Sequence, residues 1–85
     1  IDLLVEDIEA LVDDGVLNGG QGNALIAKLL NALARFENGQ AKAASNQLEA
    51  FINQVEDFVA DGILTAEQGA ALIAAVEDII GTIPG

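Results

Sequence analysis

The 85-residue sequence contains no cysteine and no histidine, and it has only three basic residues. Without cysteine the chain has no disulfides and no thiolate chemistry, and without histidine it has no imidazole acid-base catalyst. The usual zinc sites are excluded as well, because they need cysteine, histidine or both. Three basic residues against fourteen acidic ones give a net charge of -11, which excludes a basic nucleic-acid-binding surface. We therefore expect neither an enzyme nor a nucleic-acid-binding protein, and we predict no cofactor.

Long hydrophobic runs are also missing. The longest unbroken apolar stretch, Ala70 to Val76, is far shorter than the roughly 20 residues that a membrane-spanning helix needs, so no membrane insertion is expected. The sequence contains no methionine and opens with Ile1, which leads us to expect a processed product or a part of a longer protein.

The residues that are present describe one small helical domain over 1–85, since 52% of them are apolar and alanine is abundant. Shifting the sequence by 47 positions aligns residues 11–29 with residues 58–76, and ten of the nineteen pairs are identical. The domain is therefore predicted to be an internal repeat, with one copy in residues 1–38 and the other in 39–85.

Each copy carries a glycine where a helix is expected to stop. Only glycine adopts the left-handed conformation of a helix C-cap at little cost, which assigns Gly15 and Gly62 to helix ends. The apolar residues that follow, Val16 and Ile63, are expected to fold back onto the helix end as in a Schellman motif.

The next helix starts only a few residues later. Asn18 is followed three positions on by Gln21, and Thr65 by Gln68, so each copy has a predicted capping box. Such a short connection makes the flanking helices antiparallel, and each copy is predicted to be an αα-hairpin.

Apolar spacing then predicts helices at about 2–14, 19–36, 40–60 and 66–80, with Gly39 as the hinge of the middle turn. The second of these helices is expected to bury one stripe, made of Leu25, Ile26, Leu29, Leu30 and Leu33. The tail from Gly81 to Gly85 is expected to leave the helix. No useful period-2 alternation is present, so the predicted fold is all-α: an antiparallel four-helix bundle built from two duplicated αα-hairpins.

The helix predicted at 66–80 has a flat face of small residues. Ala71, Ala74 and Ala75 lie between Glu67 and Asp78, away from the expected core. Such a strip permits close packing against another protein, a neighbouring domain or a sister subunit, so these alanines are the candidate partner-binding residues.

The aspartates near the two glycines raise the alternative of a calcium site. An EF-hand loop places oxygen ligands at alternate positions and ends with an acid at position 12, but counting from Asp13 gives Gly15, Leu17 and finally Ala24. One interpretation is that Asp14 and Asp61 cap backbone N–H groups of the turn. The alternative is a weak ion site that combines Asp13, Asp14 or Asp61 with backbone carbonyls.

Three segments of the sequence resemble the pattern of a known family. They are Asp14-Gly15-x-Leu17-x3-Gln21-Gly22-x-Ala24-Leu25, Leu48-Glu49-Ala50-Phe51-Ile52-Asn53-Gln54-Val55 and Gly62-x-Leu64-Thr65-x2-Gln68. They resemble the FIMAH domain, a small helical module of secreted bacterial and archaeal multidomain proteins. Relatives often carry a histidine after the phenylalanine, where this sequence has Ile52. The resemblance implies an extracellular or cell-surface location and a non-catalytic accessory role.

The predicted function is therefore a non-catalytic interaction or attachment module of a secreted or cell-surface protein. Two alternatives remain open. The chain could be a self-assembling subunit of an extracellular filament or lattice, or a calcium-responsive module.

Overall fold

The computed structural model describes the backbone of residues 2–82 and the side chains of residues 3–82. It contains α1 (Asp2–Asp13), α2 (Gly19–Glu37), α3 (Ala41–Ala60) and α4 (Ala66–Thr82), and no strand occurs between residues 2 and 82. The all-α fold class is confirmed, and each helix begins and ends within two residues of its predicted limits.

The largest difference at a helix end concerns the tail. Gly81 and Thr82 continue α4 instead of leaving it, so this expectation is wrong for both residues. A glycine costs a helix only about 1 kcal/mol, and Gly81 does not have the positive φ that would end it. The Thr82 hydroxyl also donates a hydrogen bond of 2.7 Å to the carbonyl of Ile79. The remaining tail residues, 83–85, lie outside the described residues.

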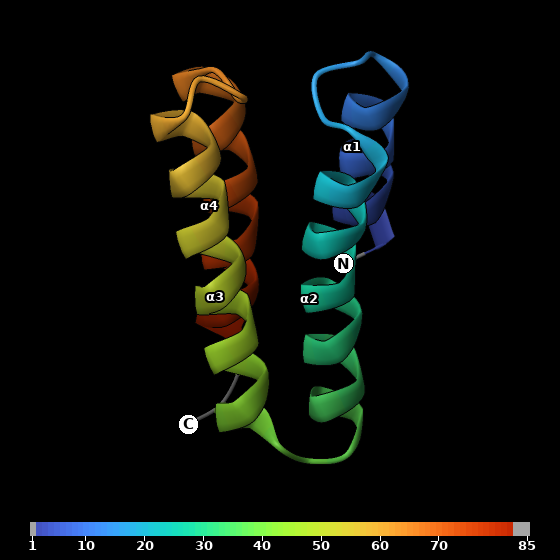
Figure 1. Ribbon diagram of the computed structural model, residues 1–85. Helices are drawn as coiled ribbons and strands as arrows, with labels where there is room; N and C mark the ends of the chain where they lie inside the picture. The colour runs from blue at the N-terminus through green and yellow to red at the C-terminus, as the bar shows by residue number, and fades with distance from the viewer. Residues whose placement is uncertain (1, 83–85) are drawn as a thin grey trace.

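The four helices form two hairpins that stand side by side (Figure 1). Helix α1 packs against α2, α2 against α3, and α3 against α4, so α2 and α3 join the two hairpins. The α1–α2 junction with Gly15 and the α3–α4 junction with Gly62 lie at one end of the molecule, and the turn between α2 and α3 lies at the other. The whole measures 36 × 19 × 17 Å.

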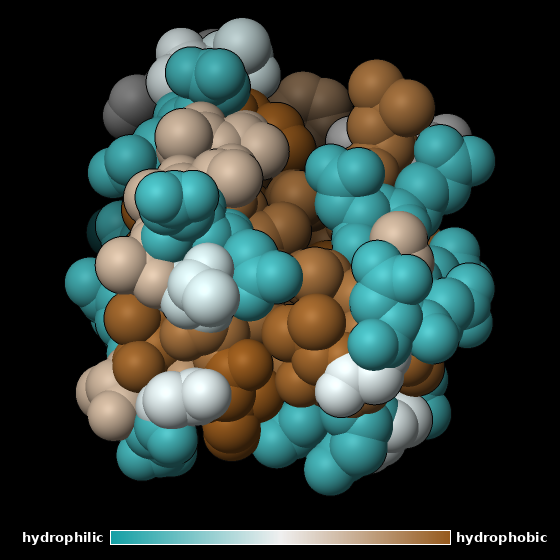
Figure 2. Space-filling model, turned by 90° about the horizontal axis from the view of Figure 1, so that it is seen from above, coloured by the Kyte–Doolittle hydropathy of each residue, from teal (hydrophilic) through white to brown (hydrophobic). Residues whose placement is uncertain are grey.

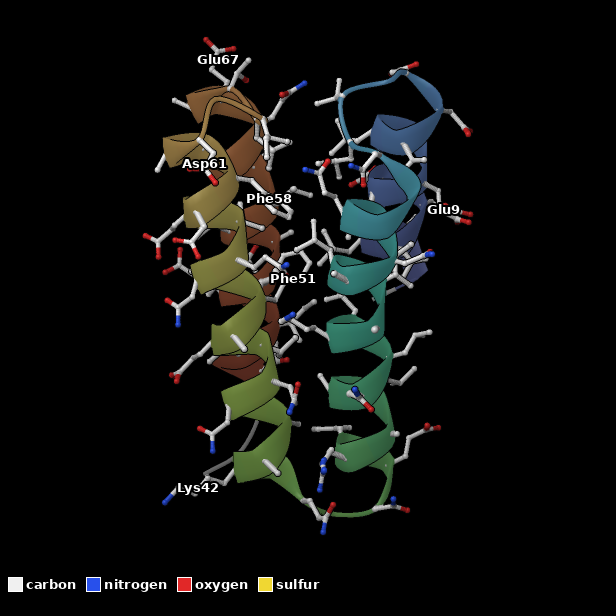
Figure 3. All side chains as sticks on the ribbon, in the orientation of Figure 1. Glu9, Lys42, Phe51, Phe58, Asp61 and Glu67 are labelled. Carbon is white, nitrogen blue, oxygen red and sulfur yellow. The ribbon has the colours of Figure 1, made fainter. Side chains whose placement is uncertain are left out.

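The core consists of apolar side chains from all four helices and from the junctions, and no polar or charged residue within 3–82 is buried. The largest of its completely buried side chains is that of Phe51, on the α3 side of the contact with α2 (Figure 3). Each fully buried side chain of this kind stabilises the fold by roughly 1.5–3 kcal/mol. Seen from the junction end, apolar residues gather between the hairpins and hydrophilic ones surround them (Figure 2).

Both junctions close in the same way. Gly15 and Gly62 have φ values of 78° and 79°. The Val16 N–H donates to the Leu11 carbonyl at 2.9 Å, and the Ile63 N–H donates to the Phe58 carbonyl at 2.8 Å. Bonds from the glycine N–H groups to the carbonyls of Val12 and Val59 complete a Schellman motif in each copy.

The helices that follow start with the predicted capping boxes. The Gln21 N–H donates to Asn18 Oδ1 at 2.7 Å, and the Asn18 N–H donates to Gln21 Oε1 at 2.9 Å. Thr65 and Gln68 exchange the equivalent bonds at 3.1 and 3.0 Å. Each box satisfies two N–H groups that a helix start would otherwise leave unpaired.

Two further glycines set the distance between the helices of each hairpin. A Cβ on Gly22 would collide with Cγ2 of Val12, and a Cβ on Gly69 would collide with Cγ2 of Val59. The same glycine–valine contact therefore holds α1 to α2 and α3 to α4. None of the helices in the described part of the chain has the length and hydrophobicity required to cross a membrane.

The second helix does not bury its whole predicted stripe. The side chain of Leu30 is 52% exposed, so its assignment to the core is wrong. The equivalent position in the second hairpin, Glu77, is exposed as well, although α3 extends past it, so Leu30 lies at the edge of the apolar face of α2. Periodicity gives the direction of this apolar face but not how much of its width is buried.

Candidate interaction surface

The alanine strip on α4 is only partly at the surface. Ala71 and Ala74 are exposed, whereas Ala75 is half-buried and packs against the core. Gly69 faces α3 from the same helix, and the 100° step per residue turns Ala71 and Ala74 away from that contact. The exposed part of the strip is thus a smooth surface that α3 does not cover.

The acidic residues near the glycines do not come together. Asp13 is the last residue of α1, and Asp14 and Asp61 follow directly after α1 and α3. All three side chains are exposed. No group of three or more acidic side chains within residues 3–82 is arranged to hold a metal ion.

The expectation that Asp14 and Asp61 cap the turns is wrong. Among the described residues, the hydrogen bonds at the two junctions come from the main chain and from the two capping boxes. The aspartates precede glycine, a frequent place for a capping side chain, but the Schellman bonds and the capping boxes already supply the bonds that close these turns.

A hollow on the first hairpin was not predicted from the sequence. It has a volume of about 160 Å³ and lies between α1 and α2, with Glu9 and Asp13 on one side and Gly19 and Asn23 on the other. This volume is well below the roughly 300–1,000 Å³ of a typical small-molecule site. The hollow therefore offers no space for a substrate or cofactor of ordinary size.

Three residues that line this hollow are not repeated in the second hairpin. The positions equivalent to Asp13, Gly19 and Asn23 are all alanine in the second copy, namely Ala60, Ala66 and Ala70.

The charges are unevenly distributed along the chain. All three basic residues, Lys28, Arg35 and Lys42, fall between residues 28 and 42, whereas residues 1–14 carry six acids and residues 49–85 carry seven, with no basic residue in either segment. Lys42 lies near the α2–α3 turn, and Asp61 and Glu67 lie at the opposite end (Figure 3). The basic residues are thus confined to residues 28–42, while the other two segments carry thirteen of the fourteen acids.

The sequence model of the FIMAH domain matches residues 1–81, which is nearly the whole chain. The chain is a FIMAH domain. No curated protein and no solved structure matches it. A FIMAH domain is an accessory domain of larger proteins, which agrees with a compact helical unit whose core is entirely apolar.

Proposed function

We propose that this FIMAH domain is a non-catalytic interaction module, which attaches a secreted or cell-surface protein to a protein partner or to a neighbouring domain. The contact is made by α4 through Ala71 and Ala74, with Ala75 supporting the strip from the core side. The observation that carries the proposal is the exposure of Ala71 and Ala74 on a face of α4 that α3 does not cover.

Small side chains suit such a contact for two physical reasons. Helix axes approach to about 8 Å only where the side chains between them are small. Alanine also loses almost no side-chain entropy when it is buried, so a complex gains packing without that cost. The flanking acids, Glu67 and Asp78, are both exposed and favour a partner with cations beside its docking face.

A non-catalytic role is supported by the chemistry of the side chains. The chain has no histidine or cysteine, and every acidic side chain that the structure describes is exposed rather than held in an apolar pocket. A general acid or base usually needs such burial to bring its pKa towards neutrality.

The test uses the repeat as its control. Ala74 and Ala27 are equivalent positions, and both are exposed. The melting temperature of the domain should be higher in the full-length protein than in isolation. Ala74→Glu should abolish this increase, whereas Ala27→Glu should leave it intact. Equal melting temperatures in both settings would contradict attachment to a neighbouring domain of the same protein.

If the partner is a separate protein, the same two variants test whether that protein binds to the α4 strip. The wild-type domain and the Ala27→Glu variant should retain that protein from the native secretion fraction, and Ala74→Glu should lose it. Retention that is equal for both variants would exclude the α4 strip as the contact.

A further inference from the structure

The hollow between α1 and α2 has an apolar part. Val12, Gly22 and Ile26 belong to its lining, and Cγ2 of Val12 packs directly on Gly22. A Cβ on Gly19, at the start of α2, would meet no atom within 4 Å, so the hollow is unobstructed on that side. Its volume of about 160 Å³ resembles that of an engineered cavity of about 150 Å³ that holds benzene. The hollow therefore accepts a group of about six non-hydrogen atoms.

The charged part of the lining comes from α1. Glu9 and Asp13 are four positions apart on this helix, so their side chains lie on the same face, and both are exposed. Figure 3 shows Glu9 projecting outward from α1. The side-chain hydrogen bonds within residues 3–82 involve neither carboxylate, so both are available to a binding partner.

Helix α2 adds a polar but uncharged group. The exposed Asn23 lines the hollow opposite the two carboxylates, and its amide oxygen can accept a hydrogen bond. The end of α1 and the start of α2 meet at this junction, and the partial charges of about -0.5 and +0.5 at these helix ends offset each other. The two carboxylates therefore decide the sign of the local charge, and the hollow attracts a cation.

A metal ion matches this lining poorly. Calcium takes about six to eight oxygen ligands, whereas only three of the lining residues carry side-chain oxygens, namely Glu9, Asp13 and Asn23. The apolar surface of Val12 and Ile26 would also contribute nothing to a metal. An organic cation with a short hydrocarbon chain uses both parts of the lining.

We propose that the hollow binds an arginine side chain of a protein partner. The methylene groups of the arginine lie on Val12 and Ile26, and its guanidinium group lies between the carboxylates of α1 and the amide oxygen of Asn23. A guanidinium group is flat and donates hydrogen bonds in several fixed directions, so it can serve acceptors on two helices at once. It is also more weakly hydrated than an ammonium group, which lowers the cost of entering a partly apolar hollow.

This contact is separate from the α4 strip. The hollow belongs to the first hairpin, whereas Ala71 and Ala74 belong to the second. The arginine site therefore does not depend on the proposed attachment through α4, and each of the two contacts can be removed without the other.

Nuclear magnetic resonance of the unmodified chain tests the site with a blocked arginine, Nα-acetyl-arginine N-methylamide. At constant ionic strength, the amide signals of Gly19, Gly22 and Asn23 should shift to saturation. The expected Kd is about 1–10 mM, because exposed ion pairs contribute little to binding. The citrulline analogue has the same shape without the charge and should cause no saturating shift, and the lysine analogue should bind several-fold more weakly.

These probes also define the outcomes against the proposal. Saturation by the citrulline analogue with an equal Kd would show that the charge is not recognised. Equal binding of the lysine analogue would overturn the choice of arginine. Shifts that stay linear for every probe would remove the site, while leaving the attachment through α4 untouched.

The second hairpin supplies substitutions that the fold tolerates. The double variant Asp13→Ala/Asn23→Ala should fold normally, because the equivalent positions already hold Ala60 and Ala70, and it should raise the Kd of the blocked arginine about tenfold. An unchanged Kd would contradict the proposal.

A matched pair of variants separates the hollow from the overall charge. Glu9→Gln should weaken binding, whereas Glu56→Gln, at the exposed equivalent position of α3, should leave the Kd unchanged. Both variants remove one negative charge. Equal weakening by the two would mean that the probe responds to the net charge of the chain and not to this hollow.

Transfer of the lining to the second hairpin is the most demanding test. The variant Ala60→Asp/Ala66→Gly/Ala70→Asn introduces the three residues that differ, since Glu56, Val59 and Ile73 already match the first hairpin. It should bind a second molecule of the blocked arginine, with saturating shifts at Gly69. A variant that folds but gains no second site would contradict the assignment of arginine binding to these residues.

Discussion

The substitution Gly22→Ala tests the contact that fixes the spacing of the first hairpin. Alanine is intrinsically better than glycine in a helix by up to about 1 kcal/mol. The new Cβ, however, would collide with Cγ2 of Val12, a β-branched side chain that has little rotational freedom in a helix. Relieving the collision requires α1 to move, and overpacking of this kind costs about 1–3 kcal/mol. The variant should therefore be less stable by about 1–2 kcal/mol.

The assay is denaturant unfolding followed by circular dichroism, with a thermal melt in parallel. For a domain of this size, a loss of 1 kcal/mol lowers the melting temperature by about 4–8 °C. Gly19→Ala is the control, because a Cβ at Gly19 meets no atom within 4 Å and the equivalent residue in the second hairpin is already alanine, Ala66. This control should be neutral or slightly stabilising.

A double-mutant cycle identifies the cause. In a Val12→Ala background the obstructing methyl groups are gone, so adding Gly22→Ala should now stabilise the domain by up to about 1 kcal/mol. If Gly22→Ala stabilises the wild-type chain as much as it stabilises the Val12→Ala variant, the glycine is not required for close approach, and the reasoning is refuted.

Three other predictions concern the junctions and the charge. Gly15→Ala and Gly62→Ala should each destabilise the domain by about 1–2 kcal/mol in chemical denaturation, because both residues have positive φ; no loss would contradict the Schellman caps. Asn18→Ala and Thr65→Ala should each cost about 0.5–2 kcal/mol in chemical denaturation, because each removes a side-chain bond that caps a helix; no loss would contradict the capping boxes. Sodium chloride should raise the melting temperature by screening the net charge of -11, and a melt indifferent to salt would contradict this.

Local chemistry was enough to predict the helices and their junctions. Gly15 and Gly62 end helices because of their backbone freedom, and Asn18 and Thr65 begin them through side-chain bonds that span three residues. Both devices depend only on residues close in sequence, which is why the sequence located them within two residues.

The surface could not be predicted to the same extent, because it depends on how far one helix covers another. Leu30 has the spacing of a core residue, yet it is more than half exposed, and the equivalent residue of the second hairpin, Glu77, is exposed too. Ala75 belongs to the same run of alanines as Ala74, yet the structure turns it towards the core. Periodicity gives the direction of a side chain, whereas its exposure depends on the lengths of neighbouring helices and on the tilt between them.

Hydrogen exchange of the backbone amides in α4 tests most directly whether this helix attaches the domain to a partner. The exchange should be measured in two states: the isolated domain, and the full-length protein bound to its partner if the partner is a separate protein. Amides around Ala71 and Ala74 should exchange more slowly in the assembled protein, while those on the solvent side of α1 should not change. Equal exchange rates along α4 in both states would contradict a role for this helix in attachment.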